Sequence, residues 1–297
     1  MIKIIIIFSI IFCILFAINN KLLYISEYFN SNKFIVSIYD PDLSHKSSFG
    51  IGDYMRGLVY LYQNTNTFII ADYRKHIISN FLYNELMDNQ DYPLIEENNI
   101  IVLSYNNVDV DTTIFDQEQL YLVTNTMFQN QNINPTITNN ILKTFKMKPD
   151  FQYKFNLKFN NLNINNNFAI LHIRLDDKYF NQDINIDDFN KLQEYIEDNI
   201  IESWDNRVLV MSNNKDIKNL LCNKYNFYQY KINPVHTDQL TDNKNNDKLL
   251  NDMEDTLIEF FTIAKSKIIF QFCDNEWQTS GFSKRISEIY NIDFIKI

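Results

Sequence analysis

The stretch FGIGDYMRGL, residues 49–58, follows a β-branched and aromatic run at Phe34–Tyr39 and opens an amphipathic segment. The chain has 297 residues but only four glycines, and three of them, Gly50, Gly52 and Gly57, lie in this stretch. A strand, a glycine-rich turn and a helix in this order are typical of the ligand-binding edge of an open α/β sheet. We therefore predict an α/β fold with a binding site where the first strand ends.

Each residue of the glycine stretch has an expected task. Gly50 and Gly52 are predicted to adopt positive φ and to let a ligand approach the backbone closely. Gly57 would let the helix pack against the sheet, and Arg56 belongs to the predicted donor-binding residues. Asp53 lies at the helix start, where it either binds a ligand or caps the helix without one. The glycine spacing fits neither a dinucleotide fingerprint nor a Walker loop.

The rest of the chain alternates short apolar strands with amphipathic helices, as layered α/β proteins do. In the first half, strands are predicted at Phe34–Tyr39, Thr67–Ala71, Ile100–Ser104 and Tyr121–Thr124, and helices at Tyr54–Gln63, His76–Met87 and Thr138–Lys146. In the second half, strands are predicted at Phe168–Ile173, Arg207–Met211, Phe227–Ile232, Lys267–Phe272 and Phe294–Ile297, and helices at Ile186–Ile200, Lys215–Tyr225, Asp255–Ala264 and Ser280–Tyr290. Pro149 and the asparagine-rich stretch 156–167 interrupt the periodicity between the two halves. We predict two Rossmann-like α/β halves, residues 30–160 and 161–297, that face a cleft.

Residues 1–29 carry a membrane signal. An apolar run from Ile4 to Ile18 follows Lys3, and no small-x-small cleavage site comes after it. The prediction is a single-pass anchor, with the body on the lumenal side of an ER- or Golgi-like compartment. A cleaved signal peptide and a secreted body are the alternative. No usable N-x-S/T acceptor supports a lumenal passage.

The charge of the chain excludes a broad electrostatic attraction to nucleic acid. Lysine and arginine number 27 against 37 acidic residues, which gives a net charge of −10. The three cysteines show no C-x-x-C or Cys/His spacing suited to zinc, so we expect no metal site.

A second motif, LHIRLDD at residues 171–177, ends a predicted strand. His172 and Arg174 alternate with leucine and isoleucine, so both should leave the same face of the strand toward a ligand. An arginine in this place suits a diphosphate, which it can grip through two hydrogen bonds. The alternative is an ion pair between Arg174 and either Asp176 or Asp177.

A third motif, TSGFS at residues 279–283, contains the fourth glycine, Gly281, between a strand and a helix. The hydroxyls of Ser280 and Ser283 and the free N–H groups of a helix start suit a phosphate. A serine cap without a ligand is the alternative. Because all three motifs lie at the carboxyl ends of strands, we expect them to form one site.

Taken in order, these motifs resemble the fucosyltransferase superfamily, namely the α1,2-, α1,6- and protein O-fucosyltransferases and the plant xyloglucan enzymes. The likeness rests on FGIGDYMRGL, HIRLDD, SKIIFQF and TSGFSKRISEIY, and it covers about residues 34–297. It implies a GT-B fold that binds GDP-fucose mainly through the C-terminal half. No metal or other cofactor is implied.

The resemblance also implies residue roles. His172 and Arg174 match the histidine and the first arginine of the family's H-x-R-R strand motif, which contacts the diphosphate, and Asp177 matches the acidic residue that ends it. Leu175 stands where the family has its second arginine. Ser280 and Ser283 look like the serines that meet the phosphates.

The implied function is a membrane-anchored, inverting glycosyltransferase that transfers fucose from GDP-fucose to a glycan or protein acceptor. Arg174 would stabilise the leaving diphosphate, and Asp53 and Asp183 are the candidate bases. One alternative is a metal-dependent transferase that uses a D-x-D motif at residues 40–42 or 109–111. Another is a non-catalytic, membrane-tethered glycan-binding or structural relative, which the leucine at position 175 favours.

Overall fold

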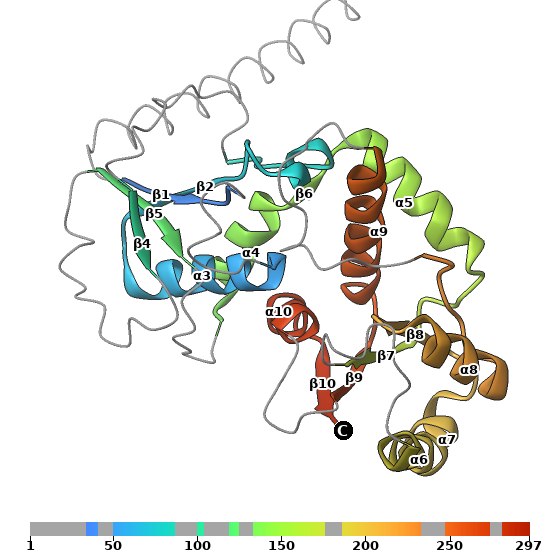
Figure 1. The fold of residues 1–297 in the computed structure, drawn as a ribbon. Coiled ribbons are helices and arrows are strands. Elements are labelled where there is room, and N and C mark those ends of the chain that lie inside the picture. Colours follow the sequence, from blue (N-terminus) through green and yellow to red (C-terminus); the bar gives the residue numbers. More distant parts are fainter. Residues whose placement is uncertain are drawn as a thin grey trace, which may run out of the picture.

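A computed structural model describes residues 34–40, 50–86, 100–103, 119–124, 133–175, 186–232, 247–273 and 281–297. Two four-stranded parallel sheets form its framework, and they confirm the predicted mixed α/β fold (Figure 1). The first sheet has the order β2-β1-β5-β4, with β1 (Phe34–Ile38), β2 (Phe68–Asp72), β4 (Ile100–Leu103) and β5 (Gln119–Thr124). The second has the order β10-β9-β7-β8, with β7 (Ala169–Arg174), β8 (Val208–Ser212), β9 (Ile268–Cys273) and β10 (Asp293–Lys296).

Helices connect and cover the strands, as crossovers between parallel strands require. They are α3 (Ile51–Asn64), α4 (Pro135–Thr144), α5 (Pro149–Asn161), α6 (Ile186–Tyr195), the π-helical turn η5 (Ile196–Ile200), α7 (Ile201–Trp204), α8 (Lys215–Tyr225), α9 (Asp247–Ile263) and α10 (Gly281–Tyr290). On one face of the second sheet, α6, η5 and α8 pack on Leu171 and Ile173 of β7. On the other face, α9 and α10 pack on Ile170 and on Ile269 of β9.

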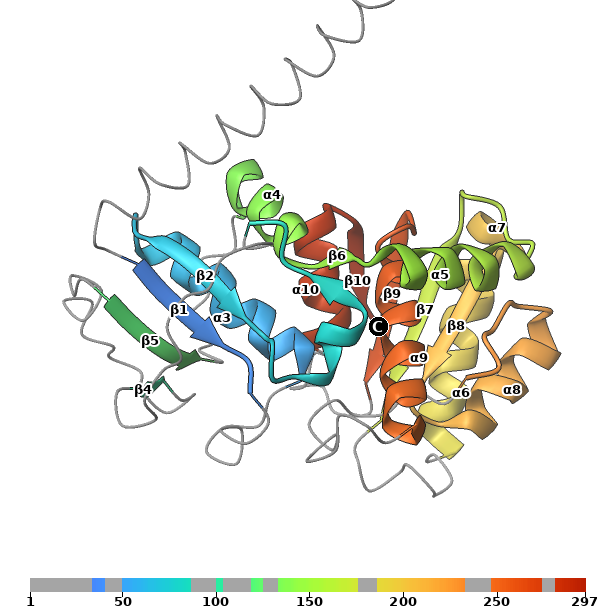
Figure 2. The same ribbon diagram turned by 90° about the horizontal axis from the view of Figure 1, so that it is seen from above.

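The core continues from one sheet to the other. One cluster of buried apolar side chains joins Val36 of β1 and Leu58 of α3 to Leu257 of α9 and Ile286 of α10. Figures 1 and 2 both place α10 between the two sheets, and α10 packs against α3. Helix α10 therefore connects β9 and β10 of the second sheet in the chain, but the first half of the chain covers part of its surface.

The helix predicted at residues 76–87 is wrong in the described residues. This region forms the 3-10 turn η1 (Ile77–Asn80) and the short strand β3 (Leu82–Tyr83), which pairs antiparallel with β6 (Lys146–Met147). The ring nitrogen Nδ1 of His76 accepts a hydrogen bond from the backbone of Ile78, and the Phe81 carbonyl accepts one from Lys148. These bonds satisfy the backbone groups without a helix.

Two other predicted boundaries also change. The asparagine-rich stretch does not begin an irregular linker, because α5 runs to Asn161; Phe151, Phe155 and Phe159 recur every four residues and form its buried face. The strand predicted at 227–232 is reduced to one isolated bridge between Leu209 and Tyr228.

The predicted membrane anchor lies in residues 1–29, outside the described residues. Among the helices that the structure describes, none combines the length and apolar character needed to cross a bilayer.

Candidate functional site

The first and third motifs meet where the N-terminal ends of α3 and α10 touch. A Cβ atom on Gly52 would lie 2.9 Å from the carbonyl carbon of Gly281 and 2.9 Å from the amide nitrogen of Phe282. Only glycine at position 52 lets the two backbones approach this closely without a shift. The contact brings the glycine stretch of the first half against the third motif in the second half.

This contact corrects the predicted reason for the glycines. None of the described glycines has positive φ, and Gly50 is the N-cap of α3 with φ −73°. Asp53 is not the cap either, since it lies within the first turn of α3. The glycine at position 52 is required by helix packing rather than by a left-handed backbone.

Charged side chains surround the contact. On α3, Nη2 of Arg56 lies 2.7 Å from Oδ1 of Asp53. A Cβ atom on Gly281 would also lie 2.7 Å from this Nη2. On α10, Arg285 pairs with Glu288, and burial, more than the nearby Arg56, lowers the pKa of Arg285. The structure thus brings the predicted residues Asp53 and Arg56 to the N-terminus of α10.

The second motif approaches the same place from the strand β7. Leu171, Ile173 and Leu175 pack in the core on the side of α6 and α8, whereas His172 reaches Ser283 on α10. The predicted alternation along the strand is therefore confirmed. Arg174 ends β7 and is partly buried.

His172 lies in a buried polar group of three side chains. Its Nδ1 is 2.8 Å from Oγ of Ser283, and Nε2 of Gln271 on β9 donates to the same Oγ at 2.7 Å. His172 and Gln271 are paired residues of neighbouring strands. Burial, reinforced by the charge of Arg174, lowers the pKa of His172 to about 4, so the imidazole is neutral at physiological pH.

Ser283 was predicted to meet a phosphate, and the structure places it in the interior. Its side chain has no exposed surface, and its hydroxyl contacts His172 and Gln271. Ser280, Asp177 and Asp183 lie outside the described residues, so their predicted roles stay predictions.

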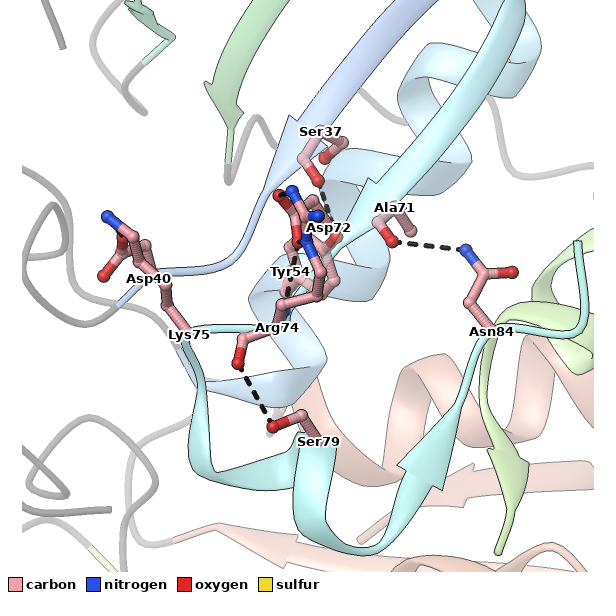
Figure 3. A network of polar contacts seen from close by, with 9 residues as sticks. All are labelled: Ser37, Asp40, Tyr54, Ala71, Asp72, Arg74, Lys75, Ser79 and Asn84. Carbon is pink, nitrogen blue, oxygen red and sulfur yellow. Dashed lines mark hydrogen bonds and ion pairs between the residues drawn. The ribbon is translucent and has the colours of Figure 1, made fainter. Parts of the chain in front are cut away.

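The carboxyl ends of β1 and β2 form a separate polar edge (Figure 3). Asp40 is almost fully buried and lies 3.1 Å from Nζ of Lys75, while Asp72 binds Arg74 through both carboxylate oxygens. Asp40 begins one of the two D-x-D matches; the other three acidic residues of these matches lie outside the described residues. Within the described segments, no three His, Cys, Asp or Glu side chains lie close enough to hold a metal ion.

Gln271 is the functional candidate that the sequence motifs did not single out. It is a single amide in the apolar strand IIFQFC, on the face of β9 that also carries Ile269. The signal was present in this isolated polar residue. Its partner, Ser283, was not evident, because the sequence does not show how the chain runs from β9 to the start of α10.

Two parallel sheets with helices packed on them, in contact through α3 and α10, define a GT-B-like α/β fold. No family model matches the chain, and no curated protein does. Among solved structures, the fucosyltransferase NodZ from Bradyrhizobium is similar with a TM-score of 0.52 and 9% identity, over 86% of this chain and 91% of that one. NodZ α-1,6-fucosyltransferase co-crystallized with GDP gives a TM-score of 0.51 at 9% identity, with the same coverage.

A variant of FUT1 from Arabidopsis thaliana, in complex with GDP, has a TM-score of 0.54 and 12% identity over 89% of this chain and 70% of that one. At such low identities the likeness shows a shared fold. The chain therefore has the fold of these fucosyltransferases.

Proposed function

We propose that the protein is an inverting glycosyltransferase that transfers fucose from GDP-fucose to a glycan or protein acceptor. The observation that carries the proposal is the contact of His172 on β7 with Ser283 in the first turn of α10, with Arg174 on the same face of β7. A helix N-terminus and an arginine are both suited to a diphosphate. Solved structures with this fold include fucosyltransferases in complex with GDP, which supports a nucleotide-diphosphate sugar as the donor.

In this proposal, Arg174 stabilises the negative charge that develops on the leaving diphosphate. His172, neutral and next to the same helix end, contributes a hydrogen bond rather than a charge. Gly50 is the N-cap of α3, Gly52 lets the start of α3 approach this region closely, and Arg56 lies over Gly281. Ser283 holds His172 through its contact with Nδ1. Ser280 and Asp177 stay predicted contacts of the donor substrate.

The acceptor hydroxyl needs a base on the face opposite the leaving group. Asp53 is the described candidate, because its side chain is 31% exposed at the junction of α3 and α10. Its Oδ1 lies 2.7 Å from Nη2 of Arg56. Asp183 stays the second candidate.

We further propose that the donor binds without a metal ion. Charge neutralisation would come from Arg174 and the α10 N-terminus instead of a divalent cation. The apolar run at residues 4–18 supports a single-pass anchor with a lumenal body, as predicted from the sequence.

A second candidate is a non-catalytic, glycan-binding relative. The observation that favours it is Leu175, which is fully buried and packs on the side of β7 away from α10. The side chain at this position thus adds no second positive charge to the donor site.

Binding of nucleotide sugars to the full chain tests both candidates. GDP-fucose, GDP-mannose, UDP-sugars and the bare nucleotides are compared by thermal shift and calorimetry, with and without manganese. GDP and GDP-fucose should stabilise the protein without metal, by about 2.7 kcal/mol at a concentration 100 times the dissociation constant. A strict manganese requirement would favour the D-x-D alternative, and binding of glycans without nucleotides would favour the non-catalytic relative.

A further inference from the structure

The direction of the hydrogen bonds among Gln271, Ser283 and His172 decides which ring nitrogen of the histidine carries its hydrogen. An amide nitrogen can only donate, so the bond from Gln271 uses Oγ of Ser283 as acceptor. The hydroxyl hydrogen of Ser283 is then free to point at Nδ1 of His172, 2.8 Å away. In this arrangement Nδ1 accepts the hydrogen of Ser283, and a neutral imidazole that accepts at Nδ1 carries its own hydrogen at Nε2.

The opposite arrangement conflicts with the same geometry. A hydrogen on Nδ1 would face the amide hydrogens of Gln271, whose Nε2 lies 3.5 Å from Nδ1. The side chains are buried, so no bulk water separates these donors. Two donors that face each other at low dielectric are unfavourable.

We propose that Gln271 and Ser283 are positioning residues that hold His172 as a neutral Nε2–H donor toward the diphosphate of the donor substrate. This inference rests on the proposed function, and it adds which ring nitrogen of the neutral His172 carries the hydrogen. Nδ1 is occupied inside the protein, so Nε2 is the nitrogen left for a ligand. His172 keeps about 9% of its residue surface exposed, and Arg174, two residues further along β7, lies on the same face.

The arrangement suits an anionic ligand in a specific way. An imidazole that presents Nε2 as an acceptor would repel phosphate oxygens, which are also acceptors. A fixed Nε2–H instead donates to them at any pH at which the ring is neutral. Fixing this hydrogen in the free protein avoids a rearrangement when the donor binds.

The test reads the hydrogen position directly. The full chain has four histidines, so ¹⁵N labelling of histidine gives few signals, and His172→Asn identifies the signals of His172. In the wild-type protein at neutral pH, Nε2 should carry the hydrogen and Nδ1 should not. In Gln271→Met, which keeps the side-chain size but cannot donate, the Nδ1–H form should become populated. GDP affinity of Gln271→Met should fall by up to about tenfold.

Thr262→Val is the matched control. It removes another buried hydroxyl of the second half, which bonds Tyr230 and the Ile258 carbonyl and does not contact His172. It should leave the histidine signals and GDP affinity unchanged.

Two results would overturn the inference. A hydrogen on Nδ1 in the wild-type protein would reverse the direction of the hydrogen bonds, and this result does not depend on any ligand. An unchanged GDP affinity in Gln271→Met, together with a changed hydrogen position, would remove the role of Nε2–H in donor binding. Failure of the wild-type protein to bind GDP would instead overturn the proposed function, while the hydrogen position could still be measured.

Discussion

Arg174 ends β7, two residues after His172 and on the same face of the strand. If it binds the donor diphosphate, Arg174→Ala removes charge-assisted hydrogen bonds of roughly 1.5 to 3 kcal/mol, and GDP affinity should fall by more than about tenfold. Arg174→Lys should restore only part, because lysine keeps the charge but not the planar two-point contact. Calorimetry with GDP and the melting temperature are measured on all three proteins. A lower melting temperature with unchanged affinity would support an ion pair in place of a phosphate contact.

His172 makes stability depend on pH in the acidic range. Burial lowers its pKa to about 4 from the ordinary 6.5, so between these values the unfolded chain binds more protons than the folded one. Stability from this group is fully present above pH 6.5 and is lost as pH falls toward 4, by about 3 kcal/mol in total. In urea titrations at several pH values, His172→Asn should flatten this part of the profile.

Glu259 supplies a control whose contribution to stability changes with pH in the opposite direction to that of His172. Burial raises its pKa to about 8, so the folded protein keeps a proton that the unfolded chain has lost above the ordinary pKa of 4.5. The stability contributed by Glu259 falls as pH rises from 4.5 to 8. Glu259→Gln should therefore lose less stability than the wild type over that range. The same slope in both variants would contradict the assignment of these two groups.

The sequence predicted which face of β7 His172 occupies, but not its burial. Alternation along a strand follows from local geometry and can be seen in the sequence. The partner of His172 is Ser283, 111 positions away in the chain. A contact at this separation depends on how the second sheet and α10 come together, which no local pattern contains.

At the scale of elements, the contact of α3 with α10 makes Gly52 less tolerant of substitution than Gly281. Gly52→Ala places a methyl group 2.9 Å from backbone atoms of α10, which can yield only if the helices separate. Gly281→Ala meets the end of the Arg56 side chain, which can move aside. We expect Gly52→Ala to cost about 1 to 3 kcal/mol of unfolding free energy and Gly281→Ala clearly less. Equal losses in denaturant titrations would show that the two helices do not meet as described.

The helices and strands were predictable where the apolar period was strong. The strands β1 and β7 and the helix α8 lie close to their predicted ranges, because their buried residues follow a clear spacing. Helix α5 was not predicted, because Pro149 and the asparagine-rich stretch 156–167 indicated an interruption, although Phe151, Phe155 and Phe159 have helical spacing. The region of η1 and β3 was wrongly predicted as helix, because β3 pairs with the distant strand β6 and no local sequence pattern shows this partner.

At the scale of the whole molecule, the continuous core predicts one unfolding transition. Buried side chains of both sheets belong to the same cluster, and α5 is tied to α9 by ion pairs of Lys154 and Lys158 with Glu254. Calorimetry should give a single peak that coincides with the loss of far-UV circular dichroism. Gly52→Ala should broaden or split this peak, because it weakens the joint between the halves. Two separate transitions in the wild-type protein would contradict a shared core.

The joint between α3 and α10 also has a consequence for biosynthesis. Gly281 leaves the ribosome about 230 residues after Gly52, which corresponds to roughly 10 to 45 s at about 5 to 20 residues per second. During that interval the surface of α3 that α10 will cover has no native partner. We therefore expect the nascent first half to need protection by chaperones until the second half emerges, and slowed translation of the second half to lengthen its exposure to aggregation.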